Sequence, residues 1–200
     1  MEGHSTVREE RRRFWAENGF GADGGYDDAW QEASFGGIPY AVPNVAARGE
    51  ALRVHDLHHL VTGYGTDWRG ESEIAGWELG SGGAGGYAYA WFIAMFGFVV
   101  GVLTMPLRTW RAFRRGRDWS NLYGLARPLD VLDEPLANVR ARLHVRRASG
   151  PLGNVLRFLA LAAVMIPIGM LCLLGTPLLV LTALVGRMRC RCPMRQQLPC

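Results

Sequence analysis

Lysine is absent from this chain of 200 residues, and all 22 of its basic residues are arginine. A codon-biased genome is the simplest explanation, so that absence supports no functional argument. Cysteine is scarce: three of the four cysteines fall in the last eleven residues, which excludes a fold stapled by disulfides. No apolar stretch follows the charged N-terminal segment 8–13, so we expect no secretory signal and a reducing, interior compartment.

Charge is missing from two long segments. Residues 79–107 and 158–186 contain no charged side chain, and each run of 29 residues exceeds the roughly 20 that a bilayer core requires. The first 100 residues hold 7 arginines and 14 acidic residues, a net charge of −7, whereas the last 100 hold 15 and 4, a net of +11. The mean hydropathy of +0.03 hides this division. An apolar content of 49% excludes a disordered chain.

The predicted fold class is all-α, in four parts. Residues 1–47 contain a short helix and an ordered loop rich in glycine, proline and aromatic residues. Residues 48–148 form a helical metal-binding core. Residues 149–188 form a hydrophobic membrane anchor, and residues 189–200 an arginine- and cysteine-rich tail.

Two helices of the core are expected to form an antiparallel hairpin. They cover residues 46–61 and 67–79, and a loop of five residues separates them. Asp67 is the expected N-cap of the second helix. A loop this short places the first turn of the second helix beside the last turn of the first.

The first uncharged run predicts an apolar helix over residues 87–105. Its small residues recur at helical spacing and include a GxxxG pair, so another helix should pack closely on that side. These small residues are Ala90, Ala94, Gly97, Gly101 and Thr104. The opposite side carries larger side chains, of which we assign Trp91, Met95 and Phe98 to a lipid pocket.

The distribution of arginine bears on membrane topology. If both uncharged runs spanned the bilayer, the histidine cluster would lie outside the cell. We therefore expect residues 87–105 to pack on the body or enter one leaflet, and residues 158–186 to anchor the chain at the cytoplasmic face of a bacterial inner membrane or its equivalent. The anchor is either one helix or a hairpin turned at 175–177. As an alternative, the protein is soluble and this apolar helix is buried in the interface of a homodimer. Arginines at 108–117 suit anionic lipid headgroups, and nucleic acid is not an expected partner.

The histidines cluster at one place. On a helix, His55, Asp56 and His59 lie at about 0°, 100° and 40°, on one arc whose opposite face is apolar. Glu71, in the first turn of the next helix, can face His59. Two imidazoles with carboxylates at this spacing predict a site for a divalent metal, zinc first, with iron, manganese or cobalt as alternatives.

Two neighbours of this site have less direct roles. His58 lies outside the arc, and Glu78 follows Glu71 by two helical turns, so both are candidates for supporting the ligands or lining the lipid pocket.

The histidine cluster also has alternative interpretations. The simplest is a solvent-exposed face of a helix without a metal. Membrane di-iron enzymes share the HxxHH box but need about eight histidines, and only five are present. A phosphohydrolase of the HD type needs a further upstream histidine and a downstream aspartate.

The spaced motif HDxxH, eleven residues, then Glu resembles the coenzyme Q (ubiquinone) biosynthesis family of the fourth COQ protein. The resemblance extends over HDLHHLVTGYG at 55–65, ESEIAGWELG at 71–80 and DVLDEPLANVRARLHV at 130–145. It implies an all-α fold and a metal, usually taken as zinc, on four ligands. Those ligands are His55, Asp56, His59 and Glu71.

The resemblance also implies a function. It implies a hydrophobic groove for a polyprenylated ring precursor, other ubiquinone-biosynthesis proteins as partners, and either a scaffold role or removal of the ring carboxylate with hydroxylation at that carbon. A divalent ion would stabilise negative charge as CO₂ leaves. Asp56 either binds the metal or shuttles a proton as a catalytic residue. A metal-dependent hydrolase of another lipid is a further alternative.

Overall fold

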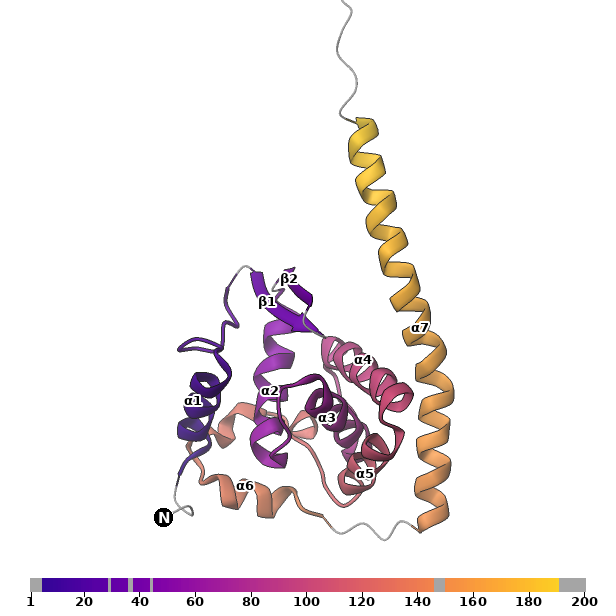
Figure 1. Ribbon diagram of the computed structural model, residues 1–200. Coiled ribbons are helices and arrows are strands. Elements are labelled where there is room, and N and C mark those ends of the chain that lie inside the picture. The colour runs from indigo at the N-terminus through magenta and orange to yellow at the C-terminus, as the bar shows by residue number, and fades with distance from the viewer. Residues whose placement is uncertain (1–4, 29, 36–37, 44, 146–149, 191–200) are drawn as a thin grey trace, which may run out of the picture.

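The computed structural model describes residues 5–28, 30–35, 38–43, 45–145 and 150–190, with side chains except in the strands after Trp30 and beyond residue 172. Nearly all of the expected tail at 189–200 is outside these residues. The elements in chain order (Figure 1) are α1 (Val7–Asn18), β1 (Trp30–Phe35), β2 (Ile38–Pro43), α2 (Ala46–Thr62), α3 (Trp68–Ser81), α4 (Ala88–Thr104), α5 (Pro106–Gly116), the 3-10 helices η1 (Leu122–Gly124) and η2 (Pro128–Asp133), α6 (Leu136–Leu143) and α7 (Pro151–Cys190).

The all-α prediction is confirmed, with one small addition. Strands β1 and β2 pair antiparallel, from Trp30 opposite Pro43 to Phe35 opposite Ile38. The turn-rich composition of this part of the chain predicts an ordered loop throughout. Each strand has only six residues, and β propensity depends on what the strand packs against, so the local pattern did not reveal the pair.

Helix α1 is fixed at its start by local and distant hydrogen bonds. The Thr6 hydroxyl accepts from the Glu9 N–H, and the Glu9 carboxylate accepts from the Thr6 N–H at 3.0 Å, a complete capping box. The N–H of Val7 donates to the carbonyl of Glu134 at 2.9 Å. These contacts join the beginning of the chain to the segment that opens α6, and so hold α1 beside α2.

Helix α3 is at the centre of the body. Asp67 caps it as expected, accepting from the Gly70 N–H at 2.9 Å. One side of α3 contributes Trp77 to a core shared with α2, η1 and α6, and the other contributes Ala75 to a core shared with α4, α5 and α7. A polar residue on this helix is therefore buried between two apolar layers.

The small-residue side of α4 packs closely on α3 and α5, which confirms the expectation from its GxxxG pair. A Cβ atom added at Gly97 would lie 2.8 Å from the Ala75 Cβ and 2.9 Å from the carbonyl oxygen of Glu71. One added at Gly101 would lie 2.4 Å from the Thr109 hydroxyl. Helix α4 is thus part of the helical body, and it contacts the turn that carries Glu71.

A larger residue at Gly97 is expected to separate α4 from α3. Gly97→Leu should lower the free energy of unfolding by about 1–3 kcal/mol through overpacking, although leucine is the better helix former. Urea unfolding measures the change. Gly86→Ala is the matched control, because nothing lies within 4 Å of an added Cβ there; equal stability for both variants would contradict the close approach.

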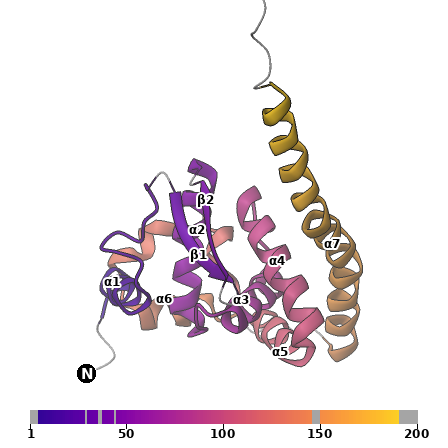
Figure 2. The same ribbon diagram turned by 45° about the horizontal axis from the view of Figure 1, so that its top comes forward.

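Helix α7 is one continuous helix of 40 residues, about 60 Å long at 1.5 Å per residue. The backbone is helical through 175–177, so of the two expected arrangements the structure has the single helix. Its first half packs on α4 and α5, with Phe158 against Phe98 and Gly169 against Val99. Its second half extends past the body (Figures 1 and 2).

Candidate metal centre

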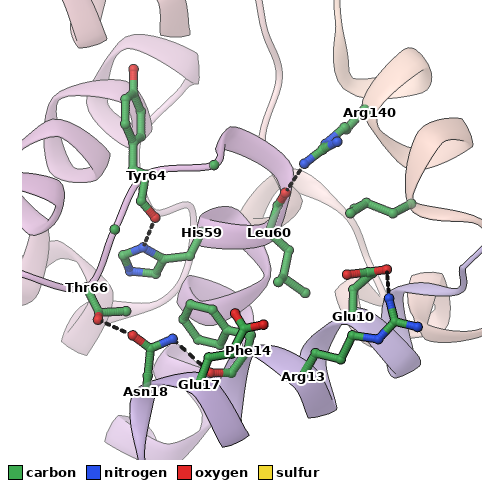
Figure 3. A pocket seen from close by; sticks show the side chains of 13 residues that line it. Glu10, Arg13, Phe14, Glu17, Asn18, His59, Leu60, Tyr64, Thr66 and Arg140 are labelled. Carbon is green, nitrogen blue, oxygen red and sulfur yellow. Dashed lines mark hydrogen bonds and ion pairs between the residues drawn. The ribbon is translucent and has the colours of Figure 1, made fainter. Parts of the chain in front are cut away.

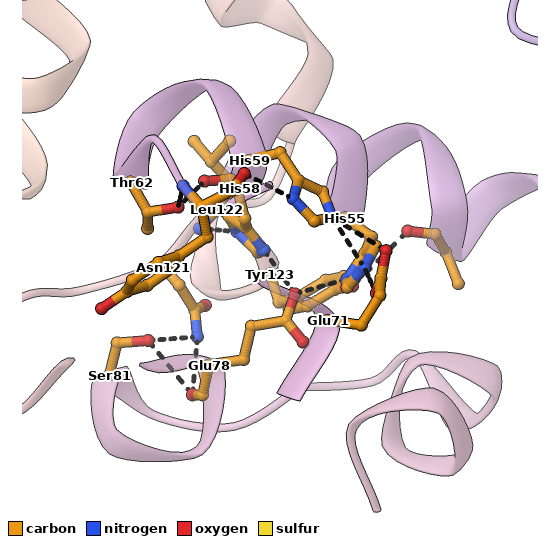
Figure 4. Close-up of polar contacts among 12 residues, drawn as sticks. His55, His58, His59, Thr62, Glu71, Glu78, Ser81, Asn121, Leu122 and Tyr123 are labelled. Carbon is orange, nitrogen blue, oxygen red and sulfur yellow. Dashed lines mark hydrogen bonds and ion pairs between the residues drawn. The ribbon is translucent and has the colours of Figure 1, made fainter. Parts of the chain in front are cut away.

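Three of the four predicted ligands converge between α2 and α3. One nitrogen each from His55 and His59 and one oxygen from Glu71 lie within 4.8 Å of one another. The two Nε2 atoms are 3.3 Å apart, Glu71 Oε2 is 3.2 Å from the Nε2 of His55, and Oε1 is 3.5 Å from that of His59 (Figure 4). Both histidines are buried, whereas 38% of the Glu71 side chain is exposed.

The separation of the two imidazole nitrogens matches what a tetrahedral ion requires. Ligands held at about 2.0–2.1 Å from zinc at tetrahedral angles are about 3.3–3.4 Å apart, and the two Nε2 atoms are 3.3 Å apart. The two oxygens of Glu71 each lie near a different imidazole, at 3.2 and 3.5 Å. The three side chains are therefore close enough together to hold a divalent cation.

The proton positions of both imidazoles follow from their other contacts. The Nδ1 of His59 lies 3.1 Å from the carbonyl oxygen of Tyr64, which can only accept, so Nδ1 carries the proton. The Nδ1 of His55 likewise donates to the Glu78 carboxylate at 2.9 Å. Both Nε2 lone pairs are therefore directed at each other and at Glu71. Three facing acceptors need a cation between them, which is the arrangement of a metal site supported by outer hydrogen bonds.

His58 serves a different purpose from its two neighbours. Its Nε2 accepts the N–H of Leu122 at 3.0 Å, and its Nδ1 therefore donates to Glu78 at 2.7 Å. The imidazole is fully buried, and burial lowers its pKa, which keeps the ring neutral. His58 thus links α2 to η1 and helps to hold the carboxylate that orients His55.

Glu78 supports the site from the protein interior. It is fully buried, and its Oε1 accepts from the imidazoles of His55 and His58. Burial would raise the pKa of this carboxyl, but the charge of His55 and the two hydrogen bonds outweigh burial and lower the pKa to about 2. Its other oxygen has no hydrogen-bond partner among the described residues.

Electrostatics favour a cation at the point of convergence. Burial lowers the pKa of His55, but the Glu78 and Glu71 carboxylates raise it further, leaving it well above the ordinary value. Burial raises the pKa of Glu71, yet the charge of His59 and the imidazole hydrogen bonds hold it below its usual range. Without a metal, a proton therefore takes the position between the facing acceptors.

Asp56 is the predicted ligand that the structure does not place with the other three. Its carboxylate is buried and accepts a short hydrogen bond from the hydroxyl of Tyr26. The Tyr26 hydroxyl in turn accepts from the Trp15 indole N–H at 3.1 Å. Burial raises the pKa of Asp56, and the Tyr26 hydrogen bond opposes that rise.

A pocket of about 330 Å³ borders the centre on the His59 side (Figure 3). It lies between α1, the loop after α2, and α6, and four charged residues help to line it: Glu10, Arg13, Glu17 and Arg140. The ring of Phe14 stacks on that of His59, with centroids 5.6 Å apart. His59 lines this pocket, although only 1% of its side chain is exposed.

The residues assigned to a lipid pocket lie on α4, apart from this polar pocket. Phe98 is fully buried and packs edge-on against Phe158, so it belongs to the contact of α4 with α7. Trp91 is 37% exposed and its indole N–H donates to the Gly85 carbonyl at 3.0 Å. Met95 is half-buried.

Several contacts that define the site could not be read from the motif. Leu122 is 64 residues from His58, and Tyr26 is 30 residues before Asp56. A backbone N–H carries no sequence signature, and the tyrosine falls in a turn-rich segment with many aromatic residues. The contact of His59 with the Tyr64 carbonyl could have been predicted from the sequence, because Gly63 ends α2 in a left-handed conformation and turns the chain back over His59.

The neutral state of His58 predicts acid sensitivity of the metal-free protein. A pKa lowered on folding gives stability that is present above the unfolded value of 6.5 and is lost as the pH falls. The raised pKa of His55 acts in the opposite sense, because its contribution to stability grows as the pH falls and is fully present well below 6.5, so His55 cannot cause a decline. The free energy of unfolding, from urea titrations with chelator, should therefore decline from pH 6.5 toward 5, and His58→Asn should flatten the decline. An unchanged slope in the variant would exclude His58 as its source.

No protein-family model matches this chain, and no curated protein or solved structure is significantly similar to it.

Proposed function

We propose that this protein binds a divalent metal, zinc in the first place, and acts in ubiquinone biosynthesis on a polyprenylated ring precursor. The observation that carries the proposal is the convergence of His55, His59 and Glu71, each imidazole oriented by an acceptor on its far side. The HDxxH-x11-E spacing that supplies these ligands is the one that resembles the ubiquinone-biosynthesis family.

The proposed reaction replaces the ring carboxyl group, which leaves as CO₂, by a hydroxyl group from water, while molecular oxygen accepts the two electrons and two protons and leaves as hydrogen peroxide. A bound divalent ion would supply charge stabilisation for the departing carboxylate. Glu78 and the Tyr64 carbonyl keep the Nδ1 protons of His55 and His59 in place, so that both Nε2 atoms remain available. The partly exposed Glu71 marks the side on which a substrate oxygen would approach.

The test combines metal analysis with mass spectrometry of co-purified lipid and a turnover assay. Wild-type protein is expected to contain about one metal per chain and to release CO₂ from the carboxylated precursor in the presence of oxygen. His59→Ala should lose both, whereas Glu50→Ala, on an exposed position of α2, should lose neither. Metal and bound precursor without turnover would favour a lipid-binding scaffold for other enzymes, and turnover of a phosphoester instead would favour a lipid hydrolase.

The proposal includes attachment to a membrane through α7. One helix among the described residues, at Pro151–Cys172, is long and apolar enough to cross a bilayer, and most of it is exposed. Contacts of the first half of α7 with the body include those of Asn154 with Arg117 and of Gly169 with Val99. The 21 residues that follow would extend about 30 Å, the thickness of a bilayer core, so we propose that this second half enters the membrane.

Two truncations distinguish the halves of α7. Removal of residues 173–200 is expected to shift the protein from the membrane to the soluble fraction with the metal site intact. Removal of residues 151–200 should in addition expose Phe98 and Phe113, which pack on Phe158, and lower the melting temperature. Flotation with liposomes and thermal unfolding measure the two effects. Continued flotation of the shorter truncation would assign membrane binding to the body or to the first half of α7.

A further inference from the structure

We propose that Tyr26 holds the carboxylate of Asp56 away from the metal, so that the ion has three protein ligands and one open position for an oxygen of an anionic substrate, a carboxylate or a phenolate. This inference rests on the metal centre proposed above. It assigns to Asp56 a role other than the ligand role that the motif implies, and to Tyr26 a role as a positioning residue.

The first observation is the partner that Asp56 has. Its Oδ2 accepts the hydroxyl of Tyr26, and both side chains are buried, with 8% and 6% of their surface exposed. A buried carboxylate needs hydrogen bonds to stay where it is. Tyr26 supplies one, and the Asp56 carboxylate is not among the ligand groups that converge, although Asp56 follows His55 directly on the same arc of α2.

The second observation is that Tyr26 is itself held rigidly. Its hydroxyl accepts the indole N–H of Trp15, and the two rings meet edge to face with centroids 5.7 Å apart. Gly24 turns the chain with φ +82° beneath these rings, where an added Cβ would lie 2.8–2.9 Å from both. The Arg53 guanidinium lies 5.1 Å from the centre of the Tyr26 ring. The hydroxyl is therefore fixed by α1, a tight turn and α2 together.

The third observation is the exposure of the centre. Structural zinc sites are closed by four protein ligands, whereas catalytic sites keep three and leave the fourth position open. With Asp56 bound to Tyr26, the converging group among the residues that the structure describes consists of His55, His59 and Glu71. Of these only Glu71 is appreciably exposed, so the open position is reached from its side.

The test uses full-length protein loaded with Co²⁺, whose visible absorption reports the coordination, and acetate as the probe of the open position. In the wild type, acetate should change the spectrum saturably. Asp56→Asn keeps the shape of the side chain and should change cobalt affinity by less than about tenfold, against a loss of more than about 100-fold for His59→Ala. Circular dichroism confirms that each variant is folded.

Tyr26→Phe is the decisive variant. Without the phenol, the Asp56 carboxylate should turn to the metal as a fourth ligand, which abolishes the acetate response and tightens cobalt binding. The double variant Tyr26→Phe/Asp56→Asn should regain the response. The inference is overturned if Asp56→Asn loses cobalt as His59→Ala does, or if Tyr26→Phe still responds to acetate like the wild type. Failure of the wild type to bind cobalt or zinc would instead overturn the proposed metal centre.

Discussion

Replacement of His59 by alanine should abolish metal binding, and this is the largest functional effect that we expect of any single substitution. The imidazole supplies one of three converging donors, and two donors cannot enclose a divalent ion. Loss of an outer hydrogen-bond partner already costs a metal site about 10–100-fold in affinity, so loss of the ligand itself should exceed that range. Elemental analysis after dialysis and titration with a metal indicator measure the change.

The fold of this variant should persist. His59 lies at the edge of the core, where its ring stacks on Phe14 and its Nδ1 donates to the Tyr64 carbonyl. In the alanine variant, the Tyr64 carbonyl and one face of the Phe14 ring would therefore be exposed to solvent in the adjoining pocket. Glu50→Ala on the same helix controls for changes to α2. Equal metal content in His59→Ala and wild-type protein would show that the metal binds elsewhere.

Replacement of Glu78 by alanine is expected to have the largest effect on stability. The carboxylate is fully buried, and its Oε1 accepts the N–H groups of His55 and His58. Removing one member of a buried charged network leaves its partners uncompensated, which typically lowers the free energy of unfolding by about 3–5 kcal/mol. Because Glu78 also fixes the tautomer of His55, the variant should bind metal more weakly.

Glu78→Gln separates the hydrogen bonds from the charge. Its carbonyl oxygen can still accept from both imidazoles, so most of the lost stability should return. Urea unfolding with chelator compares the two variants, and metal titration follows the effect on His55. A similar small change for alanine and glutamine, below about 1 kcal/mol, would show that the two imidazole contacts contribute little to the net stability.

The ligand set illustrates how far a local pattern can be trusted. His55 and His59 are one turn apart on a helix, so their convergence follows from helical geometry alone. The short loop before Asp67 then brings Glu71 to them. Asp56 met the same geometric criterion, yet a tyrosine 30 residues upstream binds its carboxylate, and no rule of helical spacing could reveal that competitor.

Glu78 shows a choice that the local pattern left open. Its position two turns beyond Glu71 made it a candidate either for supporting the ligands or for lining the lipid pocket, and in the structure its carboxylate contacts His55 and His58. The carboxylates of Glu71 and Glu78 thus both contact His55. Gly76 and Gly80 of α3 lie close to the backbone of α5, so the position of α3 also depends on packing between distant segments.

The sequence by itself determined helices α2, α3 and α4, the Asp67 cap, the small-residue face of α4 and the spacing of three ligands, because these depend on residues within a few turns of one another. Only the tertiary structure decided that Tyr26 binds Asp56, that Leu122 fixes His58, and that α7 is one helix packed by its first half. Each of these depends on groups separated by at least 30 residues or on the competition between alternative partners for one side chain. Such choices are settled when the core closes, because a buried polar group takes the partner that the packed chain brings to it.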